Sequence, residues 1–209
     1  MHKYIMEFIG TFFLVLGIGI TSDPLIIGLF LAGLIYIGAD VSGAHYNPAV
    51  SLSFLLQRKL AAHEFIGYVV SQILAAAVGA LVVFYLTGAH FFIEPAATAN
   101  ELQIILIEVL LTFVLAFVIL VICSAKSLKG THIHGLAIGL TLTALIATGS
   151  PISGGVFNPA VFVGFSVLDA FQEGTSYQLI PLYTISALLG GAVASMALNY
   201  FRRQSPKTF

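Results

Sequence analysis

The sequence contains very little charge. Of its 209 residues, 8% are Asp, Glu, Lys or Arg, whereas 59% are hydrophobic. A water-soluble domain of ordinary composition carries about 25% charged residues, so this chain is predicted to be an integral membrane protein in contact with the lipid bilayer. The formal net charge of −1 also argues against a nucleic-acid partner.

Cysteine is almost absent and tryptophan is missing altogether. The single cysteine, Cys123, excludes an internal disulfide and provides no Cys-x-x-Cys pattern for a metal or a redox reaction. We interpret it as a packing residue near one end of a membrane span. The sequence motifs also offer no combination of nucleophile, base and orienting group, so an enzyme, a metal site or a bound cofactor is not expected.

Long apolar stretches make up most of the chain. A bilayer core about 30 Å thick requires about 20 apolar residues in a helix, and stretches of roughly this length recur along the whole sequence. We predict six membrane spans, at residues 4–22, 24–40, 63–86, 102–122, 133–149 and 177–201.

One nonapeptide occurs twice, as SGAHYNPAV at residues 42–50 and SGGVFNPAV at residues 153–161. Asn followed by Pro is typical of a helix start, with Asn as N-cap and Pro in the first turn. The apolar run after each motif is short, and residues 48–57 would form a helix of only about 15 Å. Each motif therefore predicts a half-helix that enters the membrane without crossing it.

The repeat extends beyond the nonapeptide. At an offset of 111 residues Ile27-Gly28-Leu29 matches Ile138-Gly139-Leu140, and the Glu7-x3-Thr-Phe pattern recurs at Glu108. Each half thus contains three spans, an odd number, so the second half is predicted to be inverted relative to the first. The expected fold is an all-α membrane protein with six transmembrane helices, two re-entrant half-helices and an inverted repeat. It forms a single domain, residues 1–209, with halves at about 1–90 and 101–209.

The positive charges predict the orientation of this fold. In a six-span arrangement every Lys and Arg falls on one side of the membrane, which the positive-inside rule assigns to the cytoplasm together with both chain termini. These residues are Lys3, Arg58, Lys59, Lys126, Lys129, Arg202, Arg203 and Lys207.

Non-helical backbone at membrane depth is tolerated where it is buried in protein or lines a water-filled cavity. Two such segments therefore predict a polar path in which Asn47 and Asn158 donate from their amides. The two helix N-termini would repel cations and hydronium there. The predicted device is a narrow pore for small neutral molecules that excludes protons and ions. Glu7 and Glu108 are expected to brace the loops, and backbone carbonyls would accept along the pore at Gly43, Ala44, His45, Gly154 and Val156.

With these features the chain resembles the aquaporin or major intrinsic protein family. The six spans, the inverted halves, the two glutamates and Gln72 also fit this family, so the resemblance covers essentially the whole chain. It implies a homotetramer in the plasma (inner) membrane. The paired signature residues are Asn47, Pro48, Ala49, Asn158, Pro159 and Ala160.

The resemblance also implies an outer filter, which we place at Ile27, Ile146, Gly155 and Val161. The chain is atypical here, because most members have Arg directly after the second Asn-Pro-Ala. Loss of this Arg is expected to widen the constriction, whereas an apolar ring can dewet and resist water. We predict passage of ammonia, urea, hydrogen peroxide or a polyol such as glycerol, and leave water open.

Two alternatives to a passive channel remain from the sequence. A secondary transporter can also be built from inverted repeats, but it normally carries a charged or ion-coupling site at the midplane, where both motifs here supply Asn. A non-conducting structural membrane protein is the second alternative, which applies if the apolar outer filter is closed.

Overall fold

The computed structural model describes residues 1–89, 91–128 and 131–208, so Lys129, one of the cations used above, lies outside the described residues. Over this part of the chain the fold is entirely helical, with eight α-helices and two short 3-10 helices. They are α1 (His2–Thr21), α2 (Pro24–Ser42), α3 (Pro48–Leu56), α4 (Ala62–Thr87), α5 (Glu101–Ile122), η1 (Lys126–Leu128), α6 (His134–Ser153), α7 (Pro159–Phe171), η2 (Ser176–Leu179) and α8 (Ile180–Gln204).

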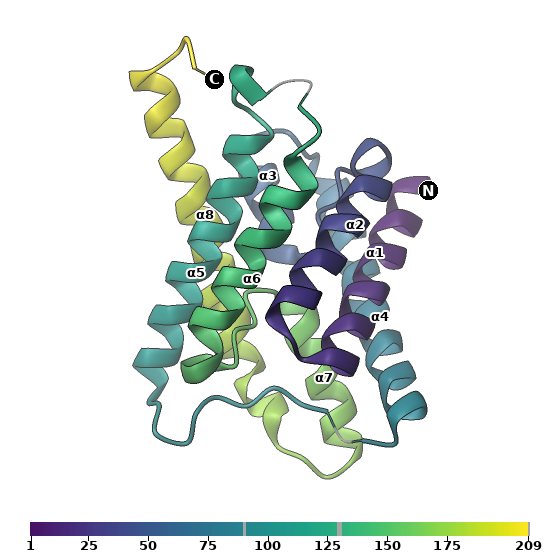
Figure 1. Cartoon of the computed structure of the whole chain (residues 1–209). Helices are drawn as coiled ribbons and strands as arrows, with labels where there is room; N and C mark the ends of the chain where they lie inside the picture. The colour runs from purple at the N-terminus through teal and green to yellow at the C-terminus, as the bar shows by residue number, and fades with distance from the viewer. Residues whose placement is uncertain (90, 129–130, 209) are drawn as a thin grey trace.

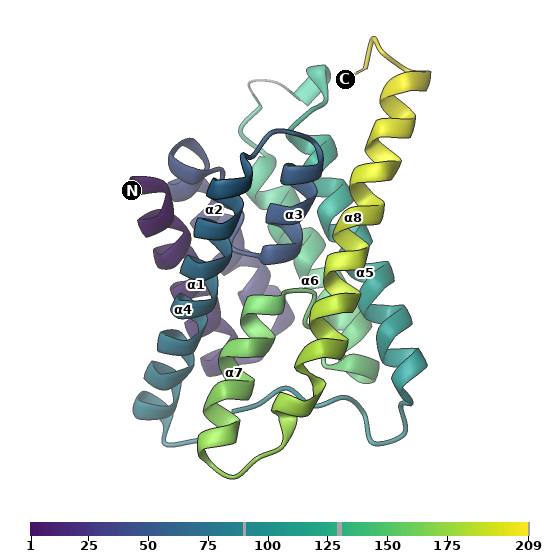
Figure 2. The same cartoon turned by 180° about the vertical axis from the view of Figure 1, so that it is seen from behind.

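Six helices in the described ranges are long and apolar enough to cross a membrane, namely α1, α2, α4, α5, α6 and α8 with η2. The helices α3 and α7 have 9 and 13 residues and are too short to span. Both begin near the middle of the bundle and extend toward its opposite ends (Figure 2). The predicted fold of six spans and two half-helices is confirmed.

Both chain termini lie at the same end of the bundle, which we call the termini face (Figure 1). Helix α3 runs from the middle of the bundle toward this face, and α7 runs toward the opposite face (Figure 2). The N-termini of the two half-helices therefore point toward one another.

The helices α2 and α6, equivalent members of the two halves, cross with their backbones in contact. A Cβ atom built on Gly28 would lie 2.3 Å from the Gly139 carbonyl oxygen, and one built on Gly139 would lie 2.3 Å from the Gly28 oxygen. Such a separation admits no side chain, so glycine is required at both positions. The contact is reciprocal, as expected at an axis relating two inverted halves.

The predicted ends of α2 and α6 were too early. The predicted spans end at about residues 40 and 149, whereas the helices continue to Ser42 and Ser153. Each ends where a glycine adopts a left-handed conformation, with φ 89° at Gly43 and 83° at Gly154. The first serine of each nonapeptide is therefore the last residue of the preceding helix, and only the following residues form a loop.

Candidate pore and its two supporting loops

A cavity of about 360 Å³ lies within the bundle, with walls from α1, α2, α5 and α6. The two nonapeptide loops, the first turns of α3 and α7 and the segment 91–94 also contribute to the wall. The cavity is lined by Asn47 and Asn158, which are 5% and 6% exposed and lie where the half-helices begin. The arrangement places a polar pair inside a mostly aliphatic passage.

Glu7, on α1, accepts hydrogen bonds from the first nonapeptide loop. Its Oε1 accepts from the Ser42 hydroxyl at 2.6 Å and the His45 N–H at 2.9 Å. Its Oε2 accepts from the Tyr46 N–H at 2.6 Å and from Gln72 Nε2 at 2.8 Å. The carboxylate is fully buried, and four donors compensate for the cost of removing it from water.

Glu108, on α5, holds the second loop in the same way. Its Oε1 accepts from the Ser153 hydroxyl at 2.7 Å and from the Val156 N–H at 3.0 Å, and its Oε2 accepts from the Phe157 N–H at 2.8 Å. Each glutamate therefore accepts two backbone hydrogen bonds from its own loop. The second loop lacks a counterpart to the Gln72 contact among the hydrogen bonds of the described residues.

These contacts determine which backbone groups face the cavity. The loop N–H groups are turned away from it, since His45, Tyr46, Val156 and Phe157 donate to the glutamates. The described residues donate no hydrogen bond to the carbonyls of Gly43, Ala44, His45 and Val156, and Ser150 makes one long contact of 3.4 Å to Gly154. All five of these residues line the cavity, and the described residues leave their carbonyls almost free of hydrogen-bond partners.

Each asparagine caps its own half-helix and also contacts the opposite loop. Asn47 Oδ1 accepts from the Ala49 N–H at 2.8 Å, and Asn158 Oδ1 accepts from the Ala160 N–H at 3.1 Å. The amide nitrogen of Asn47 donates to the Phe157 carbonyl. One N–H of each amide remains after these contacts, because an amide group has two. The prolines and alanines of both motifs, which follow the asparagines, are buried, at Pro48, Ala49, Pro159 and Ala160.

The four positions predicted for the outer filter all line the cavity. Ile27 lies on the first turn of α2 and Val161 on the first turn of α7, and both are almost fully buried. The Gly155 N–H donates to the Ser153 hydroxyl at 3.2 Å, so it is not directed at a solute. The side chains at the other three positions, Ile27, Ile146 and Val161, are aliphatic.

Sequence reasoning missed most of the cavity wall. Many wall residues occur as pairs separated by 101 or 111 residues, so the repeat offset, applied systematically, would have identified them. The pairs are Leu14 and Leu115, Ile18 and Ile119, Ile27 and Ile138, Leu31 and Leu142, Ile35 and Ile146, and Val50 and Val161. The segment 91–94, which lines the end of the cavity toward the opposite face, belongs to a loop without periodicity, so no comparable signal marked it.

The cavity end near the termini face differs from the sequence interpretation in one respect. The sequence predicts Cys123 as a packing residue. In the structure it is exposed and lines the cavity next to the end of α5. His45 also lines the cavity, and its ring packs against Phe54 while its Nδ1 lies 3.1 Å from the Ser51 hydroxyl. His134 lines this end as well, with Nε2 3.0 Å from the Leu128 carbonyl.

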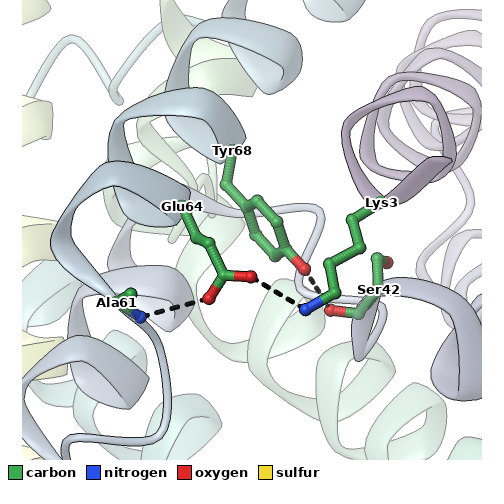
Figure 3. Close-up of polar contacts among 5 residues, drawn as sticks. All are labelled: Lys3, Ser42, Ala61, Glu64 and Tyr68. Atoms are coloured by element: carbon green, nitrogen blue, oxygen red, sulfur yellow. Dashed lines mark hydrogen bonds and ion pairs between the residues drawn. The ribbon is translucent and has the colours of Figure 1, made fainter. Parts of the chain in front are cut away.

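A polar cluster fastens α1, α2 and α4 together at the termini face (Figure 3). Lys3 forms an ion pair of 2.8 Å with Glu64, whose second oxygen accepts from the Ala61 N–H at 3.2 Å. The Tyr68 hydroxyl donates to the Ser42 carbonyl at 2.6 Å, so α4 also holds the last turn of α2. This cluster fixes the point at which the first loop leaves its helix.

Two half-helices that meet inside a lipid-exposed bundle, around a cavity with a polar centre, define an α-helical membrane channel. A sequence model of the Major intrinsic protein family matches residues 19–200, and the chain therefore belongs to this family. The predicted resemblance is confirmed.

Relatives and a solved structure agree with this assignment. The chain is 31% identical to Glycerol uptake facilitator protein-like 6 of Lactiplantibacillus plantarum over 210 residues, covering 93% of this chain and 95% of that protein. It is 30% identical to Aquaporin AqpM of Methanothermobacter marburgensis over 243 residues, covering 95% and 96%. The aquaglyceroporin from Plasmodium falciparum superposes with a TM-score of 0.82 at 26% identity, covering 96% of this chain and 94% of that one.

Membership in this family makes the chain a passive channel for small neutral solutes in a membrane, and not an enzyme. The two alternatives left open by the sequence, a secondary transporter and a non-conducting protein, are not favoured by these relatives.

Proposed function

We propose that solutes cross the membrane through the cavity between the amides of Asn47 and Asn158. The observation that carries this proposal is the meeting of both asparagines, from opposite half-helices, in the wall of one cavity. The whole chain, 1–209, acts as one channel domain whose halves, about 1–90 and 101–209, each contribute one half-helix.

Protons and ions are excluded at this centre. The N-termini of α3 and α7 each carry a partial positive charge of about half an elementary charge, which repels cations. A permeant oxygen or nitrogen that accepts from the free N–H of an asparagine has a lone pair occupied, which hinders proton relay. The pairing of Asn47 with Asn158 supports this mechanism.

The outer filter selects solutes that donate hydrogen bonds. The side chains of Ile27, Ile146 and Val161 have no hydrogen-bond donor for a lone pair of the permeant. The nearby loop offers carbonyl acceptors for its N–H or O–H groups. Each acceptor atom of the permeant that finds no donor in such a ring raises the free energy of passage by about 1–3 kcal/mol. Ammonia, with three N–H groups and one lone pair, fits best. Urea, hydrogen peroxide, glycerol and water carry more lone pairs and cross more slowly.

Flux measurements in proteoliposomes test the proposal. An internal pH dye reports ammonia entry, and stopped-flow light scattering reports water, urea and glycerol. Val161→Arg is expected to reduce solute flux, because it places a bulky cation with strong donors in the filter. Gln204→Arg, at the end of α8, is the charge-matched control and is expected to keep wild-type flux.

Each result has a definite meaning. Unchanged solute flux in correctly folded Val161→Arg would remove Val161 from the constriction. Flux that depends on a proton or sodium gradient would indicate a transporter, and no flux of any solute above that of protein-free vesicles would indicate a structural role.

We also infer that the termini face is cytoplasmic, that the protein resides in the plasma (inner) membrane, and that it assembles as a homotetramer. The described Lys and Arg residues that gather near the chain ends and the neighbouring loops support the orientation. Labelling of a C-terminal tag in sealed cells tests the orientation, and light scattering of the detergent-solubilised protein tests the number of subunits.

A further inference from the structure

The cavity contains a second set of four residues that mirrors the outer filter. Applying the offset of 111 residues to Ile27, Ile146, Gly155 and Val161 gives, in the other half, Ile138, Ile35, Ala44 and Val50. All eight residues line the same cavity. Isoleucine corresponds to isoleucine and valine to valine, and the fourth pair differs by a single methyl group.

The two sets also have equivalent surroundings. Ile35 and Ile146 are 7% and 8% exposed, and Val50 and Val161 are each 2% exposed. The four isoleucines belong to one buried apolar cluster between α2 and α6. The fourth pair shares its backbone shape, since Ala44 and Gly155 have φ of 52° and 70°.

The valines of the two sets lie on opposite sides of the asparagine pair. Val50 follows Asn47 by three residues on α3, and Val161 follows Asn158 by three residues on α7, and these half-helices run to opposite faces (Figure 2). On α2 and α6, Ile35 and Ile146 lie away from the helix crossing in opposite directions, whereas Ile27 and Ile138 lie beside the contact of Gly28 with Gly139.

We propose that Ile35, Ala44, Val50 and Ile138 form a second selectivity constriction, the inner filter, which acts in series with the outer filter. The proposal rests on the proposed function, because it concerns the same passage. A permeant crosses an apolar ring with carbonyl acceptors, then the asparagine pair, then a second ring of the same chemistry.

The valine at position 161 is what makes the two rings alike. An arginine there would place a cation and five donors in one ring and nothing comparable in the other, so the outer ring alone would control selectivity. With Val161 opposite its counterpart Val50, neither ring dominates. The inner ring carries one methyl group more than the outer ring, because Ala44 stands where the outer ring has Gly155.

Two barriers of similar height in series leave a kinetic signature. Lowering either one alone leaves the other in control, so the flux rises by at most about twofold. Lowering both removes the limit, and the flux rises far more than the product of the single effects. A single controlling filter gives the opposite pattern, in which one substitution produces the whole gain.

The test compares Ile35→Ala, Ile146→Ala and the double variant by urea flux in proteoliposomes. We expect up to about a twofold increase for each single variant and more than about fivefold for the double variant. The control is Ile185→Ala, at a position on α8 that is 65% exposed and lies outside the cavity lining, with wild-type flux expected. No effect of Ile35→Ala, with the double variant equal to Ile146→Ala, would overturn the inner filter.

A second variant guards against misfolding of Ile35→Ala. Ala44→Gly makes the fourth position identical in the two rings, and the left-handed φ of 52° favours glycine there. Combined with Ile146→Ala, it is expected to raise urea flux above that of Ile146→Ala alone, and no additional rise would count against the proposal. Ammonia flux of the wild type is measured in parallel, so failure of the channel function itself is distinguished from failure of the inner filter.

Discussion

Asn47 and Asn158 hold each other's loops in place. The amide nitrogen of Asn47 donates to the carbonyl of Phe157 at 2.8 Å, and that of Asn158 donates to the carbonyl of Tyr46 at 2.9 Å. Each acceptor immediately precedes the opposite asparagine. The two half-helices therefore form one interlocked unit, and a change in one loop is transmitted directly to the other.

The substitution Asn158→Ala tests this interlock. It removes the cap on α7 and the bond to Tyr46, and we expect unfolding to become easier by about 1–3 kcal/mol and ammonia flux to fall. Asn158→Asp keeps an oxygen for the cap but cannot donate to Tyr46, so it separates the two effects. Thermal unfolding in detergent and proteoliposome flux are the measurements. An Asp variant equal to wild type in both would show that the crossed bond is dispensable.

The two supporting glutamates are expected to differ in importance. Glu7 accepts from four donors, including Gln72, whereas Glu108 accepts from three. An amide in place of the carboxylate presents N–H groups to some of these donors, so both substitutions are expected to destabilise the fold. Glu7→Gln is expected to lower the free energy of unfolding by about 2–4 kcal/mol, and Glu108→Gln by less, since Glu108 has fewer donors. Denaturation of both variants, prepared side by side, checks the order. The reverse order would contradict the role assigned to Gln72.

The crossing of α2 and α6 requires glycine. Gly28→Ala would bring a methyl group to within 2.3 Å of a backbone oxygen, which cannot move aside. We expect loss of folded protein in membranes. Gly33→Ala, in the same helix, meets nothing within 4 Å and is expected to be neutral or to stabilise the helix by about 0.5–1 kcal/mol. Expression level and monodispersity of the two variants give the comparison, and equal behaviour would show that the crossing tolerates a side chain.

At the termini face a buried hydroxyl is expected to contribute more than an ion pair. Tyr68→Phe removes the bond to the Ser42 carbonyl and leaves a buried acceptor unpaired, which costs about 1–3 kcal/mol. Lys3→Met removes a partly exposed pair with Glu64, which contributes about 0–1 kcal/mol. Thermal unfolding of both variants tests the difference, which should persist at high salt.

The position of Cys123 predicts a pH-dependent block by thiol reagents. Although the Cys123 side chain is exposed, partial desolvation by the surrounding residues raises the pKa of its thiol, and the nearby Lys59 ammonium opposes this rise, so the thiol is mostly protonated at neutral pH. Methanethiosulfonates react with the thiolate, and their rate should therefore be slow at pH 7 and increase as the pH approaches the pKa. Modification is expected to reduce flux, since Cys123 lines the cavity. Cys123→Ser should be resistant, and undiminished flux in fully labelled protein would place the thiol outside the permeation path.

Local chemistry was sufficient to predict the elements of this fold. The lack of charge and the long apolar stretches predicted the six spans, and Asn-Pro followed by short apolar runs predicted α3 and α7. An odd number of spans in each repeat required the halves to be inverted. The helices α2 and α6 end later than predicted from the apolar stretches, because the left-handed glycines Gly43 and Gly154 decide where they end.

The sequence by itself determined that two asparagine-capped half-helices enter an apolar bundle from opposite sides, since periodicity, capping and repeat parity are properties of short segments. Only the tertiary structure decided which residues face the cavity, because Leu115 and Cys123 are brought there by the packing of α5 against distant helices. The same holds for the crossed bonds between the loops. They join residues more than 100 positions apart, and the close approach at Gly28 and Gly139 fixes the α2 and α6 packing around them.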